Sequence, residues 1–256
     1  MLPSFRLDGR VAVVTGSGSG IGRTLALGLA EAGADVVVTD LPGREADAAG
    51  TVKSVERVGR RAVALELDVR RVESIARMAD AAQAALGRVD LLVNNAGVIV
   101  RGPALELTEA QWDEVIDVNL KGAFFTSQAV ARAMVEQGGG GAIVNVASVM
   151  GRVGSPGRTA YTASKAGLIN LTRTLAAEWA PHDVRVNAIG PTFVVTPLTQ
   201  ALFDDAEFQA WYLARQPLQR FGRPEDLVGA TVFLLSDASS LVTGETLMVD
   251  GGWTAV

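Results

Sequence analysis

Residues 11–40 read VAVVTGSGSGIGRTLALGLAEAGADVVVTD. A β-branched run leads into a glycine-rich turn, an amphipathic helical pattern follows, and a second β-branched run ends at Asp40. Glycines in such a turn let the backbone approach a pyrophosphate, and the free amides at the start of the next helix face the negative charge. The stretch therefore predicts a strand–turn–helix–strand unit that binds a dinucleotide.

The same alternation of short apolar runs and long amphipathic stretches continues along the chain, and no linker or change in composition divides it. Strands are predicted at Val11–Thr15, Asp35–Thr39, Ala62–Leu67, Leu91–Val93, Ala142–Ala147, Val184–Ile189 and Thr246–Val249, and helices at Ile21–Ala32, Glu45–Val58, Val72–Leu86, Trp112–Gln137, Thr159–Trp179 and Pro224–Leu235. This pattern predicts one α/β domain over residues 1–256. We expect a Rossmann-type, doubly wound parallel sheet of seven strands with helices on both faces.

The composition narrows the class of protein. Hydrophobic residues make up 48% of the chain, and 28 acidic against 23 basic residues give a formal charge of −5, which argues against a nucleic-acid surface. No run approaches the ~18 apolar residues that span a bilayer, and the N-terminus has no signal core, so we expect a soluble, cytoplasmic protein without a membrane partner. With no cysteine and the single His182, no metal site is predicted.

The end of the second predicted strand indicates which dinucleotide binds. Asp40 lies 18 residues beyond Gly22, near the spacing at which a carboxylate hydrogen-bonds the adenosine ribose. Because Asp40 would repel a phosphate on that ribose, the sequence favours NAD over NADP. Arg23 and Arg44 keep the alternative open, since either can reach a phosphate.

Tyr161 and Lys165 stand four residues apart in a predicted helix, so both side chains face the same way. Lowering a tyrosine pKa from about 10 to about 7 requires roughly 4 kcal/mol of preference for the phenolate. A cation about 4 Å away supplies on the order of 4 kcal/mol at the dielectric typical of protein sites. We therefore expect Lys165 to lower the pKa of Tyr161 and make it an acid/base group near neutral pH.

These features together resemble the short-chain dehydrogenase/reductase family over nearly the whole chain. The turn at 15–22 is similar to the family's T-G-x-x-x-G-x-G, the pair at 161 and 165 to its Y-x-x-x-K, and residues 94–97 to its N-N-A-G. The resemblance implies a catalytic set of Asn119, Ser148, Tyr161 and Lys165. Nucleotide contacts are expected from Gly16, Ser19, Gly20, Ile21, Gly22, Asp40, Asp68, Val69, Asn95, Ala96, Gly97, Tyr161, Lys165, Pro191, Val194 and Thr196.

Roles for the implied residues follow from their places in the pattern. Ser148 closes a central strand, where open parallel sheets bind ligands, and its hydroxyl can hold a substrate oxygen. Asn119, a poor helix former within a predicted helix, is expected to bend it and anchor a water that relays protons to Lys165. Asn95 is expected to stabilise the central strands. Thr192 departs from the family's usual glycine and narrows the local backbone options.

The resemblance implies reversible hydride transfer between NAD and a secondary alcohol or ketone. Residues 196–223 resemble the gluconate 5-dehydrogenase and sugar or polyol branch, and Arg101 and Arg152 can engage a sugar carboxylate or simply be solvated. A 3-oxoacyl-(acyl carrier protein) reductase is the alternative, although an acidic chain steers poorly toward an acidic carrier domain. A non-catalytic nucleotide-binding redox sensor is the alternative from another class.

Two further expectations concern the segment before the last helix and the assembly. Within an insertion at 196–223, Phe203–Gln216 is predicted to form a lid whose Phe208, Trp211 and Tyr212 close over the substrate. The alternative is a fixed helix that buries these rings in an interface. The apolar stretches Trp112–Gln137 and Thr159–Trp179, which the family pairs across a two-fold axis, predict a homotetramer, or at least a dimer.

Overall fold

Seven parallel strands form one sheet in the order β3-β2-β1-β4-β5-β6-β7 in the computed structural model of the protein, which describes residues 2–196 and 199–255. β1 pairs with both β2 and β4, so the sheet is wound outward from β1 in two directions. The crevice at this switch point is where open α/β sheets bind ligands. The predicted fold class is confirmed. The strands are β1 (Val11–Val14), β2 (Asp35–Asp40), β3 (Ala62–Glu66), β4 (Leu91–Asn94), β5 (Gly141–Val146), β6 (Val184–Pro191) and β7 (Thr246–Val249).

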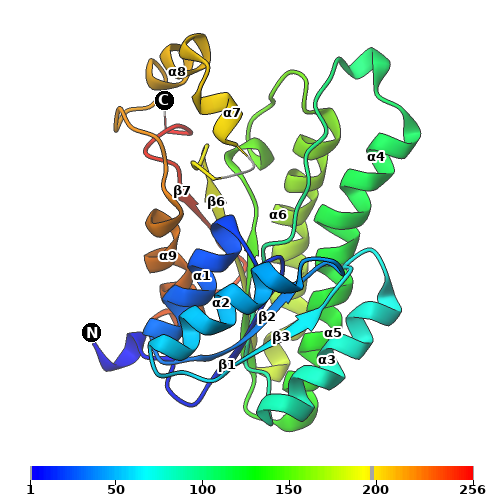
Figure 1. The fold of residues 1–256 in the computed structure, drawn as a ribbon, viewed down its shortest axis with the longest axis vertical. Helices are drawn as coiled ribbons and strands as arrows, with labels where there is room; N and C mark the ends of the chain where they lie inside the picture. Colours follow the sequence, from blue (N-terminus) through cyan, green and yellow to red (C-terminus); the bar gives the residue numbers. More distant parts are fainter. Residues whose placement is uncertain (1, 197–198, 256) are drawn as a thin grey trace.

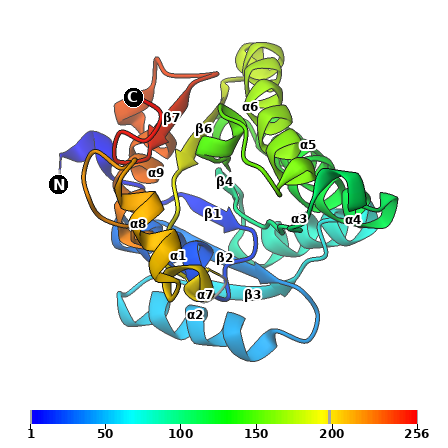
Figure 2. The ribbon, with the colours of Figure 1, turned by 90° about the horizontal axis from the view of Figure 1, so that it is seen from above.

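Helices cover both faces of the sheet (Figures 1 and 2). One layer contains α1 (Gly20–Glu31), α2 (Glu45–Arg57) and α9 (Val228–Leu235), and the other contains α3 (Val72–Leu86), α5 (Ala123–Gln137) and α6 (Thr159–Trp179). Val14 of β1 packs toward the first layer and Val13 toward the second, as the two-residue period of a strand requires. Both faces of the central strands β1 and β4 are therefore buried, whereas the edge strands β3 and β7 are partly exposed. In the part of the chain that the structure describes, no helix has the length and apolarity to cross a membrane.

The predicted single helix over Trp112–Gln137 is wrong in two respects. It begins earlier, because Thr108 and Gln111 form a capping box that starts α4 (Glu109–Ile116). It is also interrupted by a π-helical segment at Asp117–Gly122 before α5 continues. The predicted helix at Pro224–Leu235 likewise opens with a 3-10 turn, Pro224–Leu227, ahead of α9.

Two short helices, α7 (Gln200–Phe203) and α8 (Ala206–Leu213), lie beyond the carboxyl end of the sheet (Figure 1). They are held there by an aromatic cluster, which consists of Phe193, Phe208, Trp211, Tyr212 and Trp253. Tyr212 is fully buried, and its hydroxyl lies 3.1 Å from the Thr192 hydroxyl. Thr192, which replaces the family's glycine, therefore gives a buried phenol a hydrogen-bond partner.

Candidate active site

The glycine turn between β1 and α1 is closed by Asn95, which follows β4. The Asn95 amide donates to the carbonyl oxygens of Thr15 (2.9 Å) and Gly16 (3.0 Å). A Cβ at Gly22 would overlap both the Gly16 carbonyl and this amide. The third glycine of the motif is thus required by close backbone packing, and Asn95 has the structural role expected of it.

A cleft of about 470 Å³ lies above this turn, with the N-terminus of α1 in its wall. Its shape and backbone amides suit a dinucleotide, because the helix start offers N–H groups to phosphates. The cleft is lined by twelve of the predicted nucleotide contacts: Gly16, Ser19, Gly20, Ile21, Gly22, Asp40, Asp68, Val69, Asn95, Ala96, Gly97 and Thr196. The other four, Tyr161, Lys165, Pro191 and Val194, line the neighbouring cavity.

Asp40 stands at the end of the cleft where β2 stops. One carboxylate oxygen accepts from the Gly18 amide at 3.0 Å and the other from the Leu41 amide at 2.9 Å, which fixes the side chain. Arg44 also lines the cleft, with its Nε 3.8 Å from Asp40 and closer contacts to Asp47. Arg23 instead points toward α2, where its guanidinium lies 3.4 Å from the Ser54 hydroxyl. The NADP alternative therefore depends on Arg44.

Asp68, one of the expected nucleotide contacts, is held by a residue that the sequence analysis did not single out. Arg70 binds the Asp68 carboxylate through two nitrogens, at 2.7 and 2.8 Å, and shares the cleft wall with it. These hydrogen bonds keep the pKa of Asp68 below its usual value despite partial burial. Asp68 is consequently a fixed, ionised group in the wall of the cleft.

A second cavity, of about 170 Å³, adjoins the cleft and shares Ile21, Asn95, Gly97, Val98 and Thr196 with it. We call it the substrate cavity. Ser148, Tyr161 and Lys165 all line it, so the structure brings together three of the four predicted catalytic side chains. The Ser148 hydroxyl accepts from the Met150 amide at 3.1 Å, which leaves its proton available to a ligand oxygen.

The electrostatics of Tyr161 and Lys165 differ from the expectation. Burial lowers the pKa of Lys165 to about 8, and its ammonium group donates to the Val146 carbonyl at 2.7 Å. Burial also raises the pKa of Tyr161, and this effect outweighs the opposing influence of the Ser148 hydroxyl and the Arg158 guanidinium. The expected lowering of the tyrosine pKa by Lys165 is therefore wrong for the protein by itself, because desolvation outweighs the charges around it.

Asn119 lies in the π-helical segment, so the helix is irregular where a bend was expected, but its side chain lines neither cavity. Its carboxamide accepts from the Val98 amide (2.8 Å) and donates to the Val98 carbonyl (2.9 Å) and the Ser164 hydroxyl (3.2 Å). Ser164, which the sequence analysis missed, in turn donates to the Tyr161 carbonyl at 2.7 Å. Asn119 thus ties the cavity wall to the helix that carries Tyr161 and Lys165.

The arginines near the mouth are arranged differently from the prediction. Arg101 is exposed and lines the substrate cavity, whereas Arg152 donates to the Thr246 carbonyl on β7 and lines neither cavity. The sequence analysis missed Arg158, which lines the same cavity as Arg101. Its place three residues before Tyr161, on the same side of the helix start, is the signal that could have identified it.

The predicted lid residues take a different position from the expected one. Phe208, Trp211 and Tyr212 do not line the substrate cavity, and pack instead on Phe193 in the aromatic cluster. From the predicted lid insertion at 196–223, Thr196, Thr199 and Leu202 reach the cavity wall.

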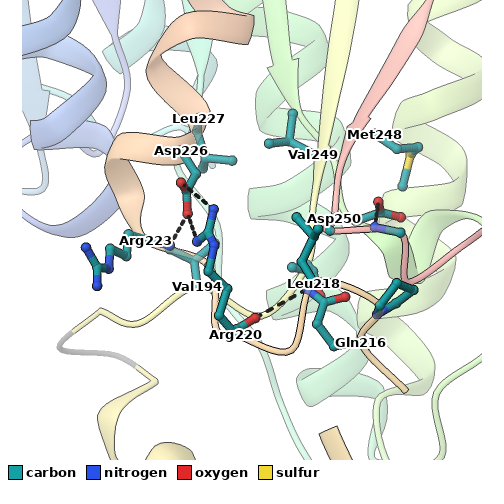
Figure 3. Close-up of a pocket in the computed structure, with 15 residues that line it drawn as sticks. Val194, Gln216, Leu218, Arg220, Arg223, Asp226, Leu227, Met248, Val249 and Asp250 are labelled. Carbon is teal, nitrogen blue, oxygen red and sulfur yellow. Dashed lines mark hydrogen bonds and ion pairs between the residues drawn. The ribbon is translucent and has the colours of Figure 1, made fainter. Parts of the chain in front are cut away.

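Figure 3 shows a further hollow, of about 510 Å³, beside the ends of β6 and β7. Arg220 reaches into it but turns toward Asp226, whose carboxylate oxygens lie 2.7 and 2.9 Å from the two terminal nitrogens. Asp226 also accepts from the Arg223 amide at 2.8 Å. Arg220 and Asp226 therefore neutralise one another and hold the loop before α9 in place.

Comparisons with known proteins identify the family of the chain. A family model described as "Enoyl-(Acyl carrier protein) reductase" matches residues 16–254. The 2-dehydro-3-deoxy-D-gluconate 5-dehydrogenase of Escherichia coli K12 is 45% identical, covering 100% of this chain and 99% of that protein. The chain belongs to the short-chain dehydrogenase/reductase family.

Two other members of the family show its range of names. The 3-oxoacyl-[acyl-carrier-protein] reductase of Thermotoga maritima is 42% identical over 97% of this chain and 99% of that one. The crystal structure of a gluconate 5-dehydrogenase from Burkholderia cenocepacia in complex with NADP and tartrate is 41% identical, with a TM-score of 0.94 over 99% of this chain and 98% of that one. This short-chain dehydrogenase/reductase is accordingly an oxidoreductase of secondary alcohols and ketones that uses a nicotinamide dinucleotide.

Proposed function

We propose that the protein interconverts a secondary alcohol and a ketone on a sugar acid, using NAD(H). The observation that carries the proposal is the substrate cavity, where Ser148, Tyr161 and Lys165 meet two arginines beside the dinucleotide cleft. No acidic side chain of the described residues lines this cavity, although the chain as a whole is acidic. A cationic cavity favours an anionic substrate over an uncharged one.

Each of the three side chains has a separate role in the reaction. Ser148 donates its proton to the reacting oxygen and orients it, and Tyr161 takes the hydroxyl proton during oxidation. Lys165 uses one of its three donors on Val146 and keeps two for ribose hydroxyls. When bound, the nicotinamide exchanges the hydride, and in its oxidised form it is a cation that favours the Tyr161 phenolate.

The cofactor preference follows from the fixed position of Asp40. Its carboxylate is held by two backbone amides at the edge of the cleft, where it can accept from the ribose hydroxyls and repel a phosphate. Arg44 lies close enough to weaken that repulsion, but it is engaged with Asp47 at 2.8 Å. These contacts support NAD, whereas the gluconate 5-dehydrogenase from Burkholderia cenocepacia was solved in complex with NADP.

A 3-oxoacyl-(acyl carrier protein) reductase is the second candidate, supported by the Thermotoga relative. The two candidates separate in a turnover screen of aldonates, alditols and 3-oxoacyl thioesters with NAD(H) and NADP(H). We expect aldonates with NAD to give the highest kcat/KM. A clear preference for acyl thioesters would replace the proposal with the second candidate, and the lack of any turnover would favour the redox sensor.

We also infer a homo-oligomer, a tetramer or at least a dimer. A shallow hollow between the π-helical segment and α6 is lined by apolar side chains that include Leu120, Phe124 and Leu171, and Trp112 on α4 remains 38% exposed. A second copy that presents the same surface would bury these groups across a two-fold axis. Light scattering at micromolar concentration tests the assembly, and a monomer mass would refute it.

A further inference from the structure

Arg158 lines the substrate cavity, and no acidic side chain of the described residues lines that cavity with it. Its Nη1 donates to the Ser155 hydroxyl at 2.8 Å, and the guanidinium carbon lies 5.6 Å from the centre of the Phe193 ring. Its Nε is buried and has no hydrogen-bond partner among the described residues. Two contacts therefore fix the group while one donor remains unsatisfied, which is costly for a buried polar atom.

The charge on Arg158 is also uncompensated. Within residues 2–196 and 199–255, neither Arg158 nor Arg101 forms an ion pair, whereas Arg220 in the hollow of Figure 3 is paired with Asp226. Burial lowers the pKa of Arg158, and repulsion by Arg101 lowers it further. A guanidinium stays charged at neutral pH even so, and two like charges share one small cavity.

We propose that Arg158 is the carboxylate-binding residue of the substrate cavity, binding one end of an aldonate through its terminal guanidinium nitrogens while Ser148 and Tyr161 hold the reacting alcohol. This assignment rests on the proposed function and names the group that selects its substrate class. A guanidinium edge carries two parallel N–H donors, which match the two oxygens of a carboxylate and only poorly match a single hydroxyl. Arg101, exposed at the mouth, adds attraction without the same fixed geometry.

The test measures binding to the protein loaded with NADH, using D-gluconate and D-gluconamide, which differ in charge at one end. Calorimetry gives the Kd of each for the wild type, Arg158→Gln, Arg158→Lys and the control Arg152→Gln. We expect Arg158→Gln to weaken gluconate binding about 30-fold, the loss typical of a hydrogen bond to a charged group, and to change gluconamide binding far less. Arg158→Lys should recover part of the gluconate affinity because it keeps the charge but not the fork.

The control variant changes an arginine of the same segment that lies outside the cavity, so its gluconate affinity should match the wild type. Equal weakening of both ligands by Arg158→Gln would overturn the assignment, and so would a wild type that binds gluconamide as tightly as gluconate. A wild type that binds gluconate through Arg158 yet turns over no aldonate supports the carboxylate site and refutes the proposed function. Turnover of aldonates that is unaffected by Arg158→Gln does the reverse.

Discussion

The dinucleotide cleft and the substrate cavity share a wall but treat charge in opposite ways. In the cleft each cation lies beside a carboxylate, with Arg70 at 2.7 Å from Asp68 and Arg44 between Asp40 and Asp47. In the cavity Arg101, Arg158 and Lys165 line the wall, and none of its described residues is acidic. The arginines of the cleft are thus paired with carboxylates, whereas the positive charge of the cavity has no acidic partner in its wall.

This difference indicates how the two regions select what they bind. A cleft whose arginines are already paired recognises a dinucleotide through its shape, its backbone amides and one fixed carboxylate. Many related chains can share these features. A cavity with unpaired cations favours an anionic ligand. Burying these cations costs free energy, and a bound anion reduces that cost. The cations whose burial lowers the stability of the protein are thus concentrated in the substrate cavity.

The largest expected effect is a loss of turnover from a change in the substrate cavity that leaves dinucleotide binding in the cleft intact. Tyr161→Phe should lower turnover by about 10³-fold or more, within the range for loss of an acid/base group, because it deletes the proton-transfer oxygen. NADH affinity should change little, since the cleft is untouched. Steady-state kinetics and fluorescence titration with NADH measure the two quantities.

The matched control is Tyr212→Phe, which removes the other tyrosine hydroxyl of the chain, outside the substrate cavity. It should retain turnover. Wild-type kcat in Tyr161→Phe would contradict the proposed mechanism.

The second effect measures the cost of uncompensated charge in the cavity. The pKa of Lys165 is about 8 in the folded protein against 10.5 for an ordinary lysine, so the unfolded chain binds its proton more tightly. The cost of burial is fully present below pH 8 and is relieved as the pH rises toward 10.5. Removing the charge with Lys165→Met should therefore raise the free energy of unfolding at pH 7 by about 3 kcal/mol, and the gain should fade above pH 8.

Urea unfolding of the protein without dinucleotide, from pH 7 to pH 10, checks this slope. Lys53→Met, at an exposed lysine of α2, is the control and should show no such pH-dependent gain. A loss of stability in Lys165→Met at pH 7 would mean that the ammonium contact to Val146 outweighs desolvation.

The third effect belongs to the cleft. Asp40→Ala should reduce the preference for NAD over NADP in kcat/KM by about tenfold to a hundredfold, because it removes a like-charge repulsion. Asp47→Ala, which removes the other partner of Arg44 but lies outside the cleft wall, should have a smaller effect. Equal use of both dinucleotides by the wild type would show that Arg44 dominates Asp40.

The smallest effect concerns the boundary of the cavity. We expect the amides of Phe203–Gln216 to gain protection from hydrogen exchange when dinucleotide and substrate bind, since Thr199 and Leu202 at its edge line the cavity. The fully buried Tyr212 limits the amplitude of that motion. Unchanged protection would identify this segment as a fixed element rather than a lid.

The sequence predicts the cleft more completely than the cavity. Its glycine turn and Asp40 lie within 30 consecutive residues, where spacing alone brings them together, and the seven predicted strands are confirmed with small shifts at their ends. Tyr161 and Lys165 are likewise local, and their common position is found as expected.

The remainder depends on contacts that spacing does not encode. The position of the Arg158 guanidinium is set by Ser155 and by Phe193, which follows the end of β6. The raised pKa of Tyr161 follows from burial, which only the packed structure determines. Apart from Asn119, nothing in the sequence indicates the π-helical segment at Asp117–Gly122. The Asn119 carboxamide makes two hydrogen bonds to the Val98 backbone, 21 residues earlier in the chain, and the sequence does not reveal this contact.

The aromatic cluster has an optical consequence. Trp211 and Trp253, two of the four tryptophans in the chain, have ring centres 5.5 Å apart, and both contact Phe193, the ring over which Arg158 lies. Their emission depends on the polarity and packing around this ring. Because Phe193 lines the substrate cavity, we expect tryptophan emission of the unlabelled protein to change when a colourless sugar acid binds, so that binding can be followed in real time without a dye.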